Sequence, residues 1–106
     1  MVNSPVRHVI LLRLHPDARD EQMSVLTTAL RELAVKIEGI VSFEYGTNNS
    51  HEGKNRGMTH VVMFTFASVE ARDAYLLHPD HLKAAARIGE LGIIEDLLVI
   101  DYMPQP

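Results

Sequence analysis

The chain alternates between segments with a strand period and segments with a helix period. Residues 6–15 are largely β-branched and apolar, which predicts a strand that ends at Pro16 and Asp17. Over residues 20–37 the apolar positions change to steps of three and four, at Met23, Leu26, Leu30, Leu33 and Ile37. This spacing forms one face of a helix, and Gly39 follows where a helix would stop.

The second half of the chain places two strands before the next helix. Residues 40–47 and 59–66 predict strands, separated by a loop rich in Gly and Asn over residues 46–57. Ser68 is a candidate N-cap for a helix to about residue 77, and Pro79 suits the first position of a helix to about residue 88. Residues 97–102 predict the last strand. Alternation within the second strand places on one side Val41, Phe43, Tyr45 and Thr47.

The resulting order β-α-β-β-α-β is that of a ferredoxin-like sandwich, an α+β fold with its helices on one face of the sheet. Such a unit leaves the other sheet face open to water. The first and third strands are apolar on both sides, and the side turned away from the helices carries Val9, Leu11, Val61 and Met63. Open apolar patches of this kind usually mark an interface. We therefore expect a homodimer formed through the open sheet face, and a monomer with an apolar sheet is the alternative.

Composition narrows the class of protein. The chain has 106 residues, which fits one domain over residues 1–106, and 46% of them are hydrophobic. Its formal charge is −4, whereas proteins that bind nucleic acid or anionic membranes carry a basic excess. The absence of Cys excludes disulfides, thiolate catalysis and Cys-type metal sites. We see neither a membrane-spanning apolar run nor a signal-peptide pattern, and so expect a cytoplasmic protein.

Histidines are the main candidates for chemistry, because the chain has six of them. His8 and His60 continue the apolar phase of their strands, so both should face the helices, where a polar group must find a partner. With Ile10 and Val62 they are expected to line any pocket in that layer. Each histidine lies early in its strand, so antiparallel strands should place the two toward different ends of the sheet.

A second group of candidates surrounds the start of the last helix, where His78 and His81 flank Pro79. The positive end of the helix dipole favours a neutral imidazole, which is a competent general base near pH 7. Tyr75 offers a phenol that could hydrogen-bond a substrate carbonyl or a developing oxyanion. The alternative for Tyr75 is an aromatic side chain that packs at the end of the preceding helix.

Metal and nucleotide chemistry find little support in the sequence. A metal bound by His78 and His81 would need a third ligand from His8, Asp73 or Asp80, and no known metal-binding pattern is present. The chain also lacks the GxSxG, P-loop and GxGxxG motifs of hydrolases and nucleotide-binding proteins. We expect neither a metal nor an organic cofactor.

Several segments together resemble the stress-responsive A/B barrel (Dabb) family, over nearly the whole chain from His8 to Tyr102. These segments are residues 7–11, 39–46, 52–60, 73–81 and 101–102. The most specific parts are Thr59-His60 and the block from Tyr75 to His81. The resemblance implies a dimeric α+β barrel built from ferredoxin-like protomers, which agrees with the fold predicted from periodicity.

The olivetolic acid cyclase branch of this family closes a linear poly-β-ketone by aldol condensation, without a metal or organic cofactor. The resemblance implies that His81 is the general base and that Tyr75 positions or polarises the substrate carbonyl. It also implies that His8, His60 and His78 line or support the site. Aromatic residues shape the pocket of that branch, whereas the corresponding places here hold Thr27, Leu30 and Ile94. The resemblance therefore implies a pocket of a different shape.

Two functions stay open on the sequence alone. The first is a cofactor-free enzyme of cyclase or lyase type that uses His81 and Tyr75 on a small ketone or aromatic molecule. The second is a non-catalytic, stress-associated dimer that carries a ligand or assists another protein, with its histidines bonded to one another or to the backbone. A cavity of about 300 Å³ or more that reaches both Tyr75 and His81 would favour a ligand site.

Overall fold

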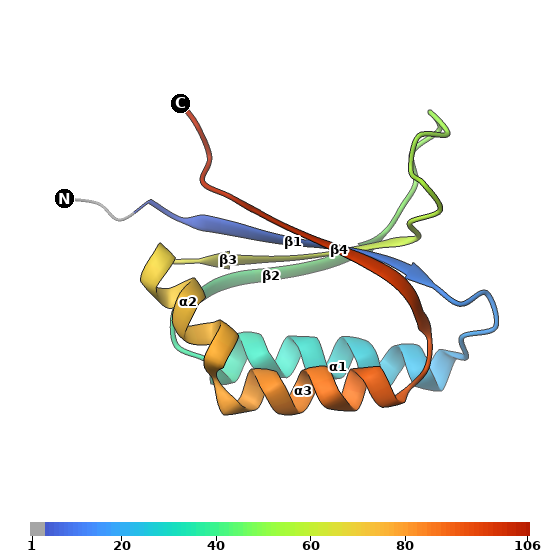
Figure 1. The fold of residues 1–106 in the computed structure, drawn as a ribbon, viewed down its shortest axis with the longest axis horizontal. Coiled ribbons are helices and arrows are strands. Elements are labelled where there is room, and N and C mark those ends of the chain that lie inside the picture. The colour runs from blue at the N-terminus through green and yellow to red at the C-terminus, as the bar shows by residue number, and fades with distance from the viewer. Residues whose placement is uncertain (1–3) are drawn as a thin grey trace.

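The computed structural model describes residues 4–106 as one sheet with helices on one side of it (Figure 1). The elements, in chain order, are β1 (Val6–Leu14), α1 (Asp20–Lys36), β2 (Ile40–Thr47), β3 (His60–Phe66), α2 (Val69–Leu77), α3 (Pro79–Glu90) and β4 (Ile94–Tyr102). The strands follow the order β2-β3-β1-β4, and each neighbouring pair is antiparallel. This arrangement confirms the predicted α+β ferredoxin-like fold.

The break between α2 and α3 has a local cause. Pro79 biases the preceding residue away from the helical region, and His78 has an extended backbone with φ −67° and ψ 133°. The Ser68 side chain caps α2 by accepting a hydrogen bond from the Ala71 backbone N–H. The Nδ1 atom of His78 caps α3 in the same way, accepting from the Asp80 N–H at 3.0 Å. The break turns the chain so that α3 lies beside α1 beneath the sheet (Figure 1).

Two details differ from the sequence prediction. The pairing of β2 with β3 shifts its register between Ile40 and Ser42, so Val41 is an extra residue and is 66% exposed. Strict alternation cannot anticipate such a bulge, which moves Val41 away from the side of Phe43. The second difference is that β4 begins at Ile94 rather than residue 97. Glu95 and Asp96 are charged, so the apolar run from which the strand was predicted begins only at Leu97.

The core lies between the sheet and the helices. Val62, Phe64 and Phe66 of β3 are fully buried, and they pack with apolar side chains from β1 and α1. Gly39 joins α1 to β2 with φ +96°, a backbone conformation that glycine adopts readily. A Cβ atom at Gly39 would lie 2.7 Å from the Cβ of Ala71, so the close approach of α2 also depends on this glycine.

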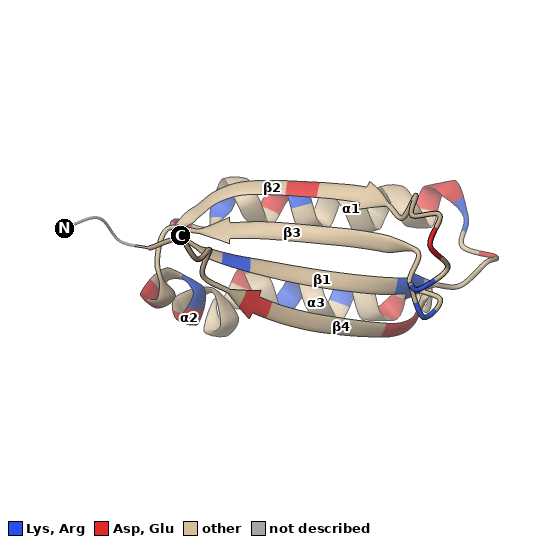
Figure 2. Cartoon of the chain, turned by 90° about the horizontal axis from the view of Figure 1, so that it is seen from above, with Lys and Arg blue, Asp and Glu red and all other residues tan. Residues whose placement is uncertain are grey.

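The opposite sheet face is free of helices, as Figure 2 shows from above. Val9, Leu11, Val61 and Met63, the residues predicted on this face, are all half-buried. Strand pairing aligns Val9 with Met63 and Leu11 with Val61, so the four side chains form one patch. Among the described helices, none combines the length and apolar character needed to cross a membrane.

Candidate functional site

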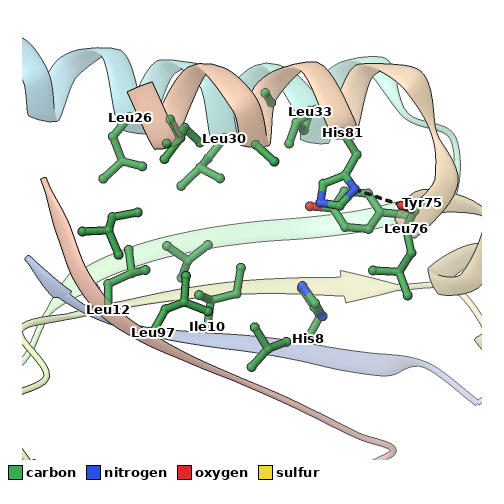
Figure 3. A pocket seen from close by; sticks show the side chains of 17 residues that line it. His8, Ile10, Leu12, Leu26, Leu30, Leu33, Tyr75, Leu76, His81 and Leu97 are labelled. Carbon is green, nitrogen blue, oxygen red and sulfur yellow. Dashed lines mark hydrogen bonds between the residues drawn. The ribbon is translucent and has the colours of Figure 1, made fainter. Parts of the chain in front are cut away.

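A cavity of about 540 Å³ lies between the sheet and the helices (Figure 3). Its volume exceeds the lower end of the usual range for small-molecule sites, about 300 Å³. Most of the lining is aliphatic and comes from both layers of the fold: Ile10, Leu12, Leu26, Leu30, Leu33, Val62, Leu76, Ala84, Ala85, Ile88, Gly89, Ile94, Leu97 and Val99. The remaining lining residues carry polar groups, and they are His8, Tyr75 and His81. The cavity is thus an apolar chamber with few polar groups.

The three polar residues gather at one end of this cavity (Figure 3). The rings of Tyr75 and His81 are in contact, with centroids 4.2 Å apart. The ring of His8 lies 5.8 Å from that of Tyr75, at 67° to it. Strand β1, helix α2 and helix α3 therefore each supply one polar ring to the same end of the cavity.

Tyr75 is held by its ring and leaves its hydroxyl available. The side chain is 2% exposed, and its ring packs on Phe66 and Phe64 with centroids 5.0 and 5.7 Å away. Within residues 4–106 the Tyr75 hydroxyl has no hydrogen-bond partner. Its oxygen is not among the polar atoms that are completely buried without a partner. Because Tyr75 lines the cavity, we infer that the hydroxyl faces it. Burial raises the pKa of Tyr75 to about 12. The phenol therefore stays protonated at neutral pH and can donate a hydrogen bond to a ligand.

His81 presents an unprotonated nitrogen to the cavity. Its Nδ1 atom lies 3.3 Å from the Leu76 carbonyl oxygen, and because a carbonyl can only accept, Nδ1 must carry the proton. In the neutral ring the lone pair is then on Nε2, on the side of the ring that Figure 3 shows toward the cavity. Burial lowers the pKa of His81 below its ordinary 6.5, the bond to Leu76 opposes this, and the charges of His8 and His78 add to the lowering. His81 is thus neutral and basic near pH 7.

His8 is the end of a polar chain that crosses three elements. Its Nδ1 atom lies 2.7 Å from Asp101 Oδ1 in β4, and Asp101 Oδ2 accepts from Arg72 Nη1 of α2 at 2.8 Å. A carboxylate accepts hydrogen bonds, so Nδ1 of His8 donates and its other ring nitrogen carries the lone pair when the ring is neutral. This chain fixes the orientation of the His8 ring at the cavity, where His8 is only 5% exposed.

The structure does not bring two of the predicted histidines into the cavity. His60 pairs with Leu12 of β1, whereas His8 pairs with Phe64, so the two histidines lie toward different ends of the sheet. The His60 ring stacks on Tyr45 with centroids 5.6 Å apart and bonds Thr59 Oγ1 through Nδ1. Burial lowers the pKa of His60 and raises that of Tyr45. His78 is occupied by capping α3.

The other predicted site residues are placed as follows. Tyr75, His81, His8, Ile10 and Val62 all line the cavity. Leu30 and Ile94, which stand where the cyclase branch has aromatics, also line it. Thr27 does not line it, and its hydroxyl donates to the Met23 carbonyl one turn earlier in α1.

Sequence reasoning missed Asp101 as the partner of His8, and Arg72 as the partner of Asp101. The signal was the alternation of β4, in which Leu97, Val99 and Asp101 share the side that faces the helices. An aspartate in that phase, opposite His8, is the partner that a buried histidine requires. Among the described residues, the acidic and histidine side chains form no group of three or more placed to hold a metal ion.

The fold and the cavity define the class as an α+β ferredoxin-like protein with an apolar chamber between sheet and helices. The chain belongs to the Stress responsive A/B Barrel Domain family (Dabb), whose model matches residues 6–104.

Two relatives match nearly the whole chain. The stress-response A/B barrel domain-containing protein HS1 of Arabidopsis thaliana is 35% identical over 100 residues, covering 94% of this chain and 90% of that protein. Olivetolic acid cyclase of Cannabis sativa is 28% identical over 102 residues, covering 94% of this chain and 97% of the cyclase. The family thus includes an enzyme that matches this chain along almost its full length.

Solved structures share the fold closely. A crystal structure of an Arabidopsis thaliana protein matches with a TM-score of 0.87 and 34% identity, over 95% of this chain and 96% of that one. The hydroxynitrile lyase of Passiflora edulis matches with a TM-score of 0.83 and 21% identity, over 96% of this chain and 94% of that one. A dimeric ferredoxin-like protein from Jannaschia sp. CCS1 matches with a TM-score of 0.79 and 24% identity, over 94% of this chain and 99% of that one. The last two likenesses establish the fold alone.

Proposed function

We propose that the cavity binds a small ketone or aromatic molecule and performs acid/base chemistry on it without a cofactor, as in the cyclase branch of the family. The observation that carries this proposal is the pairing of Tyr75 and His81 at the polar end of an otherwise aliphatic chamber of about 540 Å³. The chamber accommodates an apolar molecule, and the paired rings present a hydrogen-bond donor beside a base. The match to olivetolic acid cyclase along the chain supports the same chemistry.

The chemistry assigned to the pair is an intramolecular carbon–carbon bond formation. Nε2 of His81 takes a proton from a carbon between two carbonyl groups, and the resulting enolate carbon attacks a further carbonyl carbon of the same molecule. Tyr75 donates a hydrogen bond to the oxygen that gains charge, and the proton on His81 passes to the new alkoxide. No electrons are gained or lost overall, so this sequence needs no redox partner.

A non-catalytic ligand carrier is the second candidate function. The same aliphatic lining supports it, because a chamber of this size binds apolar molecules whether or not they react. The two candidates differ in what His81 contributes. A carrier needs the ring for packing, whereas an enzyme needs its lone pair.

We also propose that the chain assembles as a homodimer through the open sheet face. The half-buried apolar patch of Val9, Leu11, Val61 and Met63 supports this assembly. Solved relatives with the same fold are described as dimeric. Sedimentation velocity on the purified chain tests the assembly, and a monomer at all concentrations would contradict it.

The functional test compares His81→Ala with His51→Ala, a control in the exposed loop before β3. Each variant is incubated with a panel of small β-diketones and phenolic acids, and turnover and binding are both measured. Removing a positioned general base should lower the rate by about 10²- to 10⁴-fold while the control keeps it. Equal turnover by His81→Ala would reject the enzyme assignment, and binding without turnover by the unmodified chain would favour the carrier.

A further inference from the structure

The cavity is open along one side, and that side is the space between β4 and α3. Most of its lining is buried or half-buried, but five lining residues are exposed: Leu76, Ala85, Gly89, Leu97 and Val99. Helix α3 packs against α1 and α2, and it makes no comparable contact with β4. Aliphatic side chains of a ligand site are therefore left facing solvent.

Strand β4, which borders this opening, is an edge strand with apolar side chains on both of its faces. Leu97 and Val99 point into the cavity and are 46% and 50% exposed, while Leu98 and Ile100 point to the free sheet face and are 47% and 56% exposed. Edge strands that stay free in solution usually carry charges, prolines or bulges that prevent pairing with another chain. In β4 the charges Glu95, Asp96 and Asp101 and the register shift lie toward the two ends of the strand. Residues 97–100 between them have none of these features, so the middle of this edge has the character of a covered surface.

The apolar patch of the free sheet face runs directly to this edge. Strand pairing aligns Met63 and Val9 with Ile100 in one row, and it aligns Val61 and Leu11 with Leu98 in the next. On the β2 side the first row ends at Glu44. The first row is therefore bounded by charge at β2, the second row ends there at Gly46, and both rows stay apolar as far as β4.

Charges at the ends of this face make it complementary to a second copy of itself. The outward-facing row at one end contains Arg7, and the row at the other end pairs Arg13 with Asp96. Within its own copy Arg13 forms ion pairs with Glu95, at 3.4 Å from Nε to Oε2, and with Asp96, at 3.8 Å from Nη2 to Oδ2. In a two-fold assembly the same patch meets itself, so arginines and carboxylates of one copy can face those of the other.

We propose that the second copy seated on this patch extends past the β4 edge and closes the open side of the cavity, so that the ligand site is complete only in the dimer. This inference rests on the homodimer proposed above. Its consequence is linkage between the two equilibria: a ligand that binds the closed site strengthens the dimer by the same factor by which dimer formation strengthens ligand binding.

The test uses Ile100→Lys, which places a charge in the patch without altering the cavity lining. Val35→Lys is the control, because Val35 is also an exposed apolar residue and lies on α1 outside the patch. Sedimentation velocity gives the oligomeric state, and the rate of His81 modification by diethyl pyrocarbonate, read by peptide mass mapping, reports access to the cavity. His51, in its exposed loop, serves as the internal reference for that reagent.

We expect the unmodified chain and Val35→Lys to be dimers with a protected His81, and Ile100→Lys to be a monomer that has lost this protection. Dilution of the unmodified chain should release the same protection in step with the dimer fraction, which gives a second measurement that needs no variant. A monomeric Ile100→Lys with the His81 rate of the dimer would overturn the closing of the cavity and leave the dimer proposal intact. A dimeric Ile100→Lys would reject the assembly through this face and this inference with it.

Discussion

Replacement of Tyr75 by Phe separates the role of the hydroxyl from the role of the ring. The ring is 2% exposed and packs on Phe64, Phe66 and His81, and Phe keeps these contacts. The hydroxyl has no partner among residues 4–106, so its removal breaks no hydrogen bond within the protein. The hydroxyl faces the cavity rather than being enclosed, so only part of the cost of a buried hydroxyl without a partner, about 1–3 kcal/mol, applies to it. We therefore expect Tyr75→Phe to raise the free energy of unfolding by up to about 1 kcal/mol.

The same substitution should reduce function. One donor to a developing oxyanion is worth about 10²- to 10³-fold in kcat, so turnover should fall by that factor while stability rises. Tyr75→Ala is the contrast, because it also removes the ring and should cost about 3–5 kcal/mol. Urea unfolding followed by circular dichroism measures the stabilities. A loss of more than about 1 kcal/mol in Tyr75→Phe would refute the reasoning, since it would mean that the hydroxyl holds a structural hydrogen bond.

Three further outcomes test other parts of the structure. Gly39→Ala should lose more than about 1 kcal/mol of stability in urea unfolding, because its φ is +96° and the new Cβ would lie 2.7 Å from that of Ala71. Asp101→Asn should lose about 1–3 kcal/mol and shift the ring nitrogen resonances of His8 in NMR spectra, since the carboxylate that orients that ring is gone. His81 has a lowered pKa in the folded state, so the unfolded chain binds more protons below pH 6.5. Stability should therefore fall as the pH drops from above 6.5 through that lowered pKa, and this slope should flatten in His81→Gln.

Most of the fold could be predicted from the sequence because each element carries a local signal. Apolar steps of three and four marked α1, and Pro79 marked the division between α2 and α3. The missed features depend on pairing between strands. Val41 leaves its expected side because β2 takes an extra residue opposite β3, and β4 starts early because Ile94 pairs with Leu14. Periodicity along a single strand contains no information about either pairing.

The candidate site was predictable as far as strand phase and helix position determine which way a side chain points. His8 faces the helices because of its strand phase, and Tyr75 and His81 meet because Pro79 folds α3 back from the end of α2. His60 has the same phase as His8, yet it lies by Leu12 rather than Phe64. The position of each histidine along its strand predicted that the two lie toward different ends of the sheet, and the strand pairing agrees. The sequence could not decide which of the two shares a cavity with Tyr75 and His81.

The aliphatic lining supports both of the chemical roles that we propose, through one physical cause. Burial beside an apolar chamber disfavours charge, which raises the pKa of Tyr75 to about 12 and lowers that of His81. Both shifts widen the pH range in which the phenol keeps its proton and the imidazole lacks one. Even at the ordinary pKa values of 10.0 and 6.5 a phenol does not transfer its proton to an imidazole, and the two shifts increase this difference. The aliphatic lining therefore favours the neutral forms of both groups, and these are the forms that the proposed acid/base chemistry needs.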